Sequence, residues 1–190
     1  MLILASSSPR RKELIKRFGL QFATLNPRYE EEKIDGNILS CVSNIAKAKV
    51  RSISDTVSDR PIIGADTIVV LEDKPMGKPK TSQEAKKMLT MLSGKWHEVY
   101  TGVYILYNDE ESDSFIECTK VKFRNIPKEV IDRYVSTGSP FDKAGGYGIQ
   151  DTGSIFIERI EGDFYNVMGL PIGRIWECLR NRGVLRNKGI

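Results

Sequence analysis

Cysteine is scarce in this sequence of 190 residues, which has only Cys41, Cys118 and Cys178, far apart and without a CxxC pair. An odd number of widely spaced cysteines indicates neither a disulfide framework nor a zinc site, and it favours a reducing, cytoplasmic compartment. Long apolar runs are also lacking, because the N-terminal run Leu2–Ala5 is only four residues long. A membrane helix or signal peptide needs a longer run, so we expect neither.

Two further scarcities narrow the function. The net charge is only +4 and the basic residues are scattered, which favours small anionic ligands over a long nucleic-acid track. We therefore do not expect a nucleic-acid partner, although weak binding stays open. His97 is the single histidine and has no Ser or Cys partner in a recognisable catalytic arrangement, so we expect a structural hydrogen bond from it.

The phosphate loop of P-loop kinases and ATPases is missing as well. Neither Gly77-Lys78 nor Gly94-Lys95 is followed by the Ser or Thr that GxxxxGK[ST] requires, which argues against that class. What the chain does have is 40% hydrophobic residues and no linker or repeat. Its length predicts a single domain over residues 1–190, with room for two lobes.

The first notable motif is SSSPRR, Ser6 to Arg11, between an apolar strand pattern and a helix that stops at Gly19. Ser8 is a favourable N-cap and Pro9 suits the first helical position. Arg10 and Arg11 add positive charge where the helix dipole is already positive. Two interpretations are open: an exposed, solvated basic helix, or an anion site in which backbone N–H groups, Ser6, Ser8 and the arginines bind phosphate.

Asp66 interrupts the apolar stretch from Pro61 to Leu71, which otherwise predicts a mostly buried strand. A carboxylate there is costly to bury unless it is paired, bound to a metal or lining a cleft. The functional interpretation makes it the first candidate for a catalytic residue. The structural alternative is a carboxylate held by backbone N–H groups at a bulge.

Two other charged features have both a plain and a functional explanation. Lys49 falls on the apolar stripe of a helix predicted from about Asn37 to Ile53, where a lysine can snorkel to solvent or point toward a phosphate. The acidic cluster Glu30-Glu31-Glu32 is either a solvated loop or the source of a carboxylate for a metal ion that carries phosphates.

Later segments add turns that could approach a ligand. Met76-Gly77-Lys78-Pro79 predicts a rigid turn that presents Lys78. The loop from Ser139 to Gln150 combines three glycines with Lys143 and Gln150. Glycines allow close backbone approach of a ligand, and an amide such as Gln150 can read a donor and an acceptor on a nucleobase; the alternative is a loop made only of turns.

The remaining patterns predict ordinary elements. Thr81 and Glu84 form a capping box for a helix that ends at Gly94, and a hairpin is expected from Trp96–Tyr107 and Ser114–Phe123. A helix follows Pro127, a strand is expected at Ser154–Arg159, and a last helix begins near Pro171.

In this order, the motifs SSSPRR, GADT, GKP, SGKWHEVYTG, DKAGGYGIQ and GDFYNVMGLP closely resemble the Maf family of nucleoside triphosphate pyrophosphatases, over about Leu2 to Asn181. The resemblance implies an elongated α/β fold around a mixed sheet flanked by helices, with two lobes and a central cleft, related to the inosine triphosphate pyrophosphatases. It also implies metal-dependent hydrolysis of a nucleoside triphosphate to the monophosphate and pyrophosphate, and a homodimer. The family is associated with septum formation in bacterial division.

Within the family, one branch acts on 7-methylguanosine triphosphate and another on dTTP and UTP. The first typically has SPWR, GSDQ and a glutamate where this chain has SPRR, GADT and Gln150. Arg10, Thr67 and Gln150 therefore place the chain, by resemblance, with the dTTP/UTP branch, as the residues that read the base.

The resemblance and the residues together predict a mechanism. Asp66 accepts the proton of the attacking water, and Mg²⁺ or Mn²⁺ is held partly by Glu31 and Asp66. The sequence leaves open which of the two carboxylates is the base and which the metal ligand. The cations of Arg11, Lys49, Lys78 and Lys143 bind phosphates together with the helix start at Ser6 and Ser8. The competing hypothesis is a non-enzymatic nucleotide- or nucleic-acid-binding regulator of septum formation.

Overall fold

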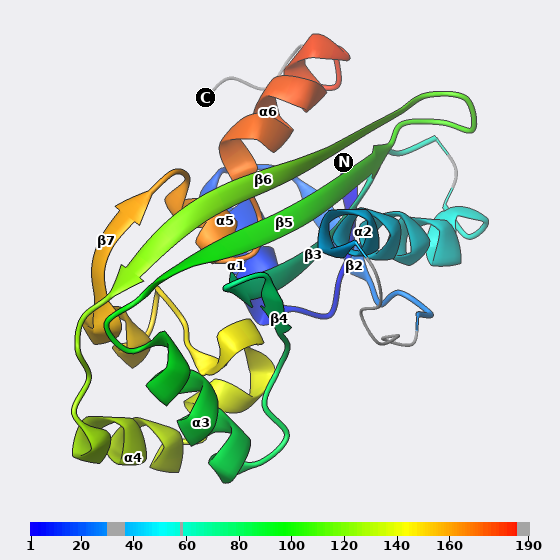
Figure 1. Ribbon diagram of the computed structural model, residues 1–190. Helices are drawn as coiled ribbons and strands as arrows, with labels where there is room; N and C mark the ends of the chain where they lie inside the picture. Colours follow the sequence, from blue (N-terminus) through cyan, green and yellow to red (C-terminus); the bar gives the residue numbers. More distant parts are fainter. Residues whose placement is uncertain (30–36, 58, 186–190) are drawn as a thin grey trace. The chain divides into compact units, whose positions relative to one another are not determined.

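The computed structural model describes residues 1–29, 37–57 and 59–185. A seven-stranded sheet has the strand order β2-β1-β3-β5-β6-β7, with β4 paired to β3 (Figure 1). The strands are β1 (Leu2–Ala5), β2 (Phe22–Leu25), β3 (Ile62–Leu71), β4 (Lys74–Met76), β5 (Trp96–Leu106), β6 (Ser112–Phe123) and β7 (Ile157–Glu161). β1 pairs in parallel with β2 and β3, whereas β4 and β7 pair antiparallel with β3 and β6.

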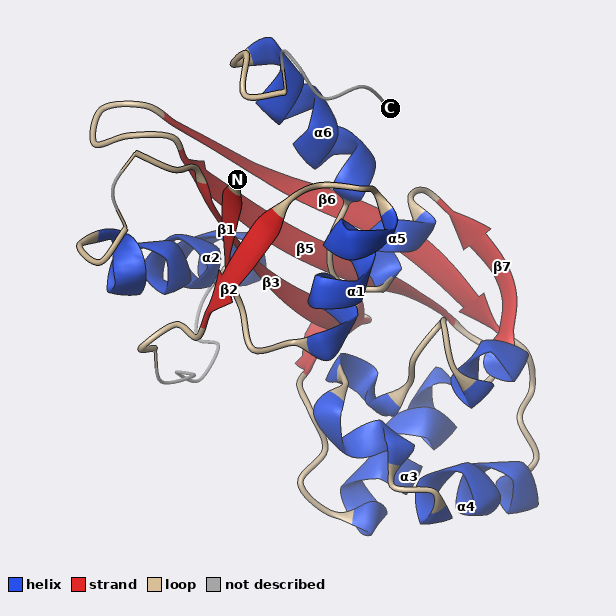
Figure 2. Cartoon of the chain, turned by 180° about the vertical axis from the view of Figure 1, so that it is seen from behind, coloured by secondary structure: helices blue, strands red, loops and turns tan. Residues whose placement is uncertain are grey.

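Helices alternate with these strands along much of the chain and flank the sheet (Figure 2), so the predicted mixed α/β fold is confirmed. The α helices are α1 (Pro9–Arg17), α2 (Ile38–Ser54), α3 (Ser82–Leu92), α4 (Lys128–Ser136), α5 (Phe164–Val167) and α6 (Ile172–Asn181). Three 3-10 turns follow α4: η1 (Ser139–Asp142), η2 (Ala144–Gly146) and η3 (Thr152–Phe156). Within the part of the chain that the structure describes, no helix has both the length and the apolar character needed to cross a membrane.

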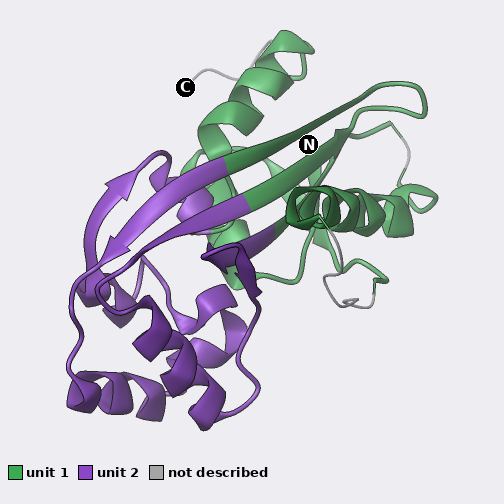
Figure 3. Ribbon diagram, viewed as in Figure 1, with its two compact units in different colours: residues 1–66, 101–117, 169–190 green, residues 67–100, 118–168 purple. Residues whose placement is uncertain are grey.

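The chain divides into two compact units (Figure 3). Unit 1 comprises residues 1–66, 101–117 and 169–190, and unit 2 comprises residues 67–100 and 118–168. The boundary falls inside β3, between Asp66 and Thr67, and β5 and β6 also contribute to both units. A single domain over residues 1–190, and the cleft expected from the family resemblance, stay predictions.

In unit 1 the parallel strands β1, β2 and the first part of β3 carry helices on both faces. α2 lies in front of the strands in Figure 1, and α1 lies in front of them in the reversed view of Figure 2. Apolar residues of α2, such as Ala46, Val50 and Ile53, pack on Ile3 and Ile62 of the strands. α2 begins as the sequence predicts, because the side chain of its N-cap residue Asn37 accepts a hydrogen bond from the backbone N–H of Ser40.

Unit 2 has its own apolar core. Leu89 and Leu92 of α3 and Ile131 of α4 pack with Phe123 of β6 and Phe156 of η3. The predicted cap of α3 is confirmed at Thr81, whose Oγ1 accepts from the N–H of Glu84 at 3.1 Å.

The last strand of unit 2 corrects a prediction. The segment Ser154–Arg159 was expected as a strand, but Thr152–Phe156 form the 3-10 turn η3 and β7 begins at Ile157. The carboxylate of Asp151 accepts a hydrogen bond from the N–H of Gly153 and starts this turn. The local cap therefore forms a turn where the start of the strand was expected, and Ile155 in this turn is largely exposed. The strand β4 and the short helix α5 were not predicted.

Candidate functional site

The predicted anion site at the start of α1 has the expected backbone. Ser8 stands at the N-cap in an extended conformation, Pro9 begins the helix, and the first turn carries no acidic residue. The side chain of Ser8 makes no capping hydrogen bond; instead, the buried hydroxyl of Ser6 accepts from the N–H of Ser8 at 3.1 Å. Both serines thus lie at a helix N-terminus that the macrodipole and Arg10 make positive.

Arg11 in the first turn of α1 is anchored to a distant part of unit 1. Its Nε donates to the carbonyl oxygen of Gly169 at 2.7 Å. Gly169 has φ of 103°, a conformation that favours glycine. Arg10 and Arg11 are both half-buried. The bond to Gly169 fixes the plane of the Arg11 guanidinium, and phosphate binding by this group stays a prediction.

Asp66 and Lys49, predicted separately, form an ion pair in unit 1. Lys49 Nζ lies 2.5 Å from Asp66 Oδ1, and the two side chains are only 11% and 18% exposed. Asp66 and Thr67 are the two half-buried residues in an otherwise buried β3. The described contact of the Asp66 carboxylate is therefore with a lysine of α2, and the lysine turns toward a partner instead of snorkelling to solvent.

Glycines in the strands allow α2 to reach Asp66. A Cβ added at Gly64 of β3 would lie 2.6 Å from Val50 Cγ2 and 2.8 Å from the carbonyl oxygen of Ala46. One added at Gly102 of β5 would lie 2.6 Å from the carbonyl oxygen of Val42. Contacts this short exclude a side chain, so α2 packs with its backbone directly on the two strands. This close approach brings Lys49 within hydrogen-bond distance of Asp66.

Four predicted site residues belong to unit 2. Thr67 follows Asp66 in β3 and is half-buried, whereas Lys78 and Gln150 are exposed. Gln150 lies in a turn between η2 and η3. Lys143 is 8% exposed and ends among oxygen atoms of its own loop, including Asp142 Oδ1 at 2.7 Å and the carbonyl oxygen of Ser139 at 2.6 Å. The roles predicted for these four residues stay predictions.

The predicted metal ligand Glu31 lies outside the described residues. The other predicted ligand, Asp66, offers the carboxylate oxygens that Mg²⁺ and Mn²⁺ prefer. Within residues 1–29, 37–57 and 59–185, no group of three or more His, Cys, Asp or Glu side chains is placed to hold a metal ion.

His97 has the structural role that was expected. It is 2% exposed, and its Nε2 hydrogen-bonds the hydroxyl of Tyr147 at 2.7 Å. Its ring also packs edge-on against Phe123 at 4.8 Å between centroids, and the buried Nδ1 has no hydrogen-bond partner among the residues that the structure describes. Burial lowers the pKa of His97 from its usual 6.5 to about 3, because the charged imidazolium would lose its hydration.

We expect this histidine to destabilise the protein in mild acid. Its folded-state pKa lies below the unfolded value, so the unfolded chain binds the proton and stability is lost as the pH falls from 6.5 towards 3. The free energy of unfolding should drop by on the order of 2 kcal/mol between pH 8 and pH 5 from this group alone. Urea unfolding of wild type and His97→Gln at both pH values measures it, and equal pH dependence in the two proteins would contradict the assignment.

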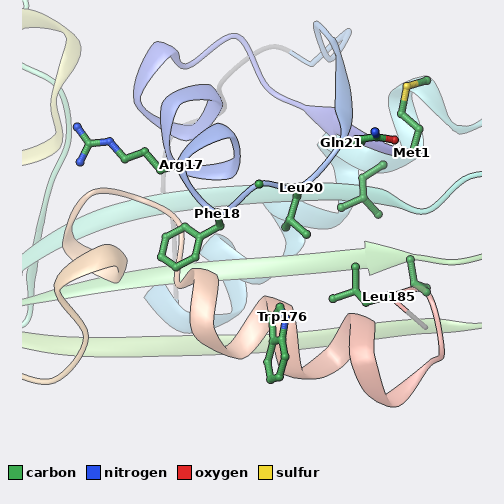
Figure 4. Close-up of a pocket in the computed structure, with 10 residues that line it drawn as sticks. Met1, Arg17, Phe18, Leu20, Gln21, Trp176 and Leu185 are labelled. Carbon is green, nitrogen blue, oxygen red and sulfur yellow. The ribbon is translucent and has the colours of Figure 1, made fainter. Parts of the chain in front are cut away.

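A pocket of about 340 Å³ opens in unit 1, between the end of α1, the start of the chain and α6 (Figure 4). Phe18, Leu20 and Trp176 are among the residues that line it, and Arg17, which also lines it, is paired with Glu13 at 2.6 Å. None of the predicted site residues lines it, and none of the described residues that line it is a histidine, cysteine or acid. It is therefore not the candidate site.

Sequence reasoning missed two residues that hold predicted site residues in place. Gly169 accepts the hydrogen bond of Arg11, and Asp151 contacts Lys143 at 3.2 Å. Gly169 lay in a motif used for the family resemblance, and its position before Leu170-Pro171 was the available signal. For Asp151, the only signal in the sequence was its position next to Gln150.

The chain is similar to known proteins over most of its length. A dTTP/UTP pyrophosphatase of Thermosipho melanesiensis is 47% identical over 184 residues, which are 97% of this chain and 99% of that protein. A dTTP/UTP pyrophosphatase of Bacillus cereus is 46% identical over 175 residues, which are 92% of this chain and 91% of that protein. The solved Staphylococcus aureus Ham1 protein is similar with a TM-score of 0.46 and 13% identity, over 65% of this chain and 72% of that chain.

The model of the Maf family, described as Maf-like protein, matches residues 1–182. That range contains every predicted site residue, from Ser6 to Gln150. The family resemblance inferred from the ordered motifs is thereby confirmed, and the chain belongs to the Maf family.

Proposed function

We propose that this protein hydrolyses nucleoside triphosphates, with dTTP and UTP as preferred substrates, to the monophosphate and pyrophosphate. The observation that carries the proposal is the ion pair between Lys49 of α2 and Asp66 of β3, whose Nζ and Oδ1 atoms lie 2.5 Å apart. Asp66 is half-buried in a strand that is otherwise mostly buried. The names of the relatives at 46% and 47% identity support the same reaction.

Asp66 is the proposed general base. The oxygen of a water molecule forms a bond to the α-phosphorus, the bond from that phosphorus to the oxygen bridging to the β-phosphate breaks, and pyrophosphate leaves. The proton of the attacking water passes to the Asp66 carboxylate. Lys49 Nζ, 2.5 Å away, orients this carboxylate until the water is in place.

Cations stabilise the charge that develops on the leaving pyrophosphate. In this proposal Arg11, Lys49, Lys78 and Lys143 bind phosphate oxygens, together with Ser6, Ser8 and the backbone N–H groups at the start of α1. The bond from Arg11 Nε to Gly169 leaves the guanidinium plane fixed, which favours binding of a phosphate in one orientation.

The chemistry of the donors fits a divalent cation. Mg²⁺ is usually bound through one or two carboxylates together with substrate phosphates, and Asp66 and Glu31 are the carboxylates we assign to Mg²⁺ or Mn²⁺. When bound, such an ion neutralises charge on the phosphate oxygens.

Arg10, Thr67 and Gln150 are the residues proposed to read the base. The exposed amide of Gln150 offers one donor and one acceptor, which suits the O4 and N3–H edge of uracil or thymine. We further propose a cytoplasmic enzyme that works as a homodimer and removes noncanonical nucleotides or arrests division.

A pyrophosphate-release assay tests the proposal. With Mg²⁺ present we expect turnover of dTTP and UTP well above that of CTP, ATP, GTP and 7-methyl-GTP, and we expect EDTA to abolish it because the leaving group then loses its neutralising cation. Adding Mn²⁺ or Mg²⁺ in excess should restore activity. Folded protein that turns over none of these nucleotides, but binds DNA with strong salt dependence, would support the regulator instead.

A further inference from the structure

The predicted base-reading residue Gln150 sits at the exposed tip of a tightly closed segment of unit 2. A Cβ added at Gly153 would lie 2.9 Å from the carbonyl oxygen of Gly148, so the two ends of the segment 148–153 touch. Gly148 and Gly153 are buried, whereas Gln150 between them is exposed. Small displacements of either end would therefore move the Gln150 amide.

Asp151, the residue after Gln150, ties this segment to the rest of unit 2. Its Oδ1 accepts from the N–H of Gly153 at 2.7 Å. Its Oδ2 accepts from Ser139 Oγ at 3.1 Å and lies 3.2 Å from Lys143 Nζ. The hydroxyl of Tyr134 in α4 approaches Oδ1 at 3.4 Å. The Asp151 carboxylate thus links Gly153 and Ser139 to Tyr134 in α4.

Lys143 and Gly148 complete the arrangement around this carboxylate. Lys143 Nζ donates to the carbonyl oxygen of Ser139 at 2.6 Å. The backbone of Ser139 is therefore held next to the ion pair of Lys143 and Asp151. A Cβ added at Gly148 would lie 2.5 Å from Asp151 Oδ2 and 2.8 Å from Lys143 Cε. Gly148 therefore packs directly on the ion pair, and any side chain there would displace it.

We infer that Asp151 is a specificity-positioning residue, which holds the amide of Gln150 in the orientation that distinguishes dTTP and UTP from other nucleotides. The inference rests on the proposed function, since it concerns how that site selects its substrate. It acts through Gln150: the carboxylate itself reads no base, and its contacts with Ser139, Lys143 and Gly153 set the path of the backbone on both sides of Gln150.

Asp142 provides a matched control within the same network. It also contacts Lys143, with Oδ1 at 2.7 Å from Nζ, but its side chain is 59% exposed compared with 27% for Asp151. The bonds with Ser139 Oγ and the Gly153 N–H that hold the closed segment are made by Asp151. Asp142→Asn therefore removes the same charge from the same lysine while leaving the closed segment held.

The test compares kcat/KM for dTTP, UTP and CTP in wild type, Asp151→Asn, Asp142→Asn, Gln150→Ala and the double variant Gln150→Ala/Asp151→Asn. We expect Asp151→Asn to lower the preference for dTTP over CTP by about tenfold or more, because a displaced amide no longer meets the base edge. Asp142→Asn should keep the wild-type preference. The double variant should show the same preference for dTTP over CTP as Gln150→Ala alone, since Asp151 acts through Gln150.

A general loss of structure would lower kcat/KM equally for all three nucleotides and would overturn the inference, as would additive losses in the double variant.

Amide hydrogen exchange gives a second measurement that is independent of turnover: Gly148 to Gly153 should exchange faster in Asp151→Asn than in Asp142→Asn. Equal exchange in the two variants would also overturn it. A wild type without turnover of dTTP and UTP contradicts the proposed function, whereas selective wild-type turnover that Asp151→Asn preserves contradicts the positioning role alone.

Discussion

Replacing Asp66 with asparagine is expected to reduce the hydrolysis of dTTP and UTP by about 10²-fold to 10⁴-fold, the usual contribution of a positioned general base. Asparagine keeps the shape of the side chain and an oxygen that can face Lys49, but it cannot accept the proton of the attacking water. The loss should therefore appear in kcat. Steady-state rates of pyrophosphate release with Mg²⁺ measure it.

Asp132 supplies the matched control for this variant. Its Oδ1 also lies 2.5 Å from a lysine, Lys86, but the two side chains are 39% and 45% exposed. Asp132→Asn thus breaks an ion pair of the same length on the surface of unit 2, and it should leave kcat near the wild-type value. If Asp66→Asn retained more than about a tenth of wild-type turnover, Asp66 would not be the general base.

Local signals made much of the fold predictable. The cap at Thr81 and the stop at Gly19 depend on neighbouring residues in the chain, and the structure has a helix ending at Arg17 and another capped by Thr81. The alternating patterns likewise identified the strands β5 and β6. These features need no knowledge of the tertiary structure.

The contacts of the candidate site were less predictable, because they join residues far apart in the chain. The sequence singled out Asp66 for its burial cost and Lys49 for its place on an apolar helix stripe, yet their pairing depends on how closely α2 approaches β3. The hydrogen bond from Arg11 to Gly169 joins residues that are 158 positions apart in the sequence, and no local sequence pattern predicts it. At β7 a local contact overruled a prediction: the cap by Asp151 forms the turn η3 where the first residues of the strand were predicted, and the strand begins at Ile157.

A methyl group at Gly102 is expected to destabilise the protein strongly. The added Cβ of Gly102→Ala would lie 2.6 Å from the carbonyl oxygen of Val42, 2.8 Å from its carbonyl carbon and 3.0 Å from the backbone nitrogen of Ser43. These are backbone atoms of α2, which cannot rotate away as a side chain could. Overpacking of this kind costs about 1–3 kcal/mol, and each kcal/mol lowers the midpoint of thermal unfolding by roughly 2–4 °C in a chain of this size.

Gly173→Ala in α6 is the matched control, because a Cβ there meets nothing within 4 Å. In an exposed helix the change should be neutral or stabilising by up to about 1 kcal/mol, since alanine favours helix more than glycine does. Equal unfolding midpoints for Gly102→Ala and Gly173→Ala would contradict direct packing of the α2 backbone on β5. If α2 is instead pushed off the strand, Lys49 moves with it, so Gly102→Ala should also lose turnover at temperatures where it remains folded.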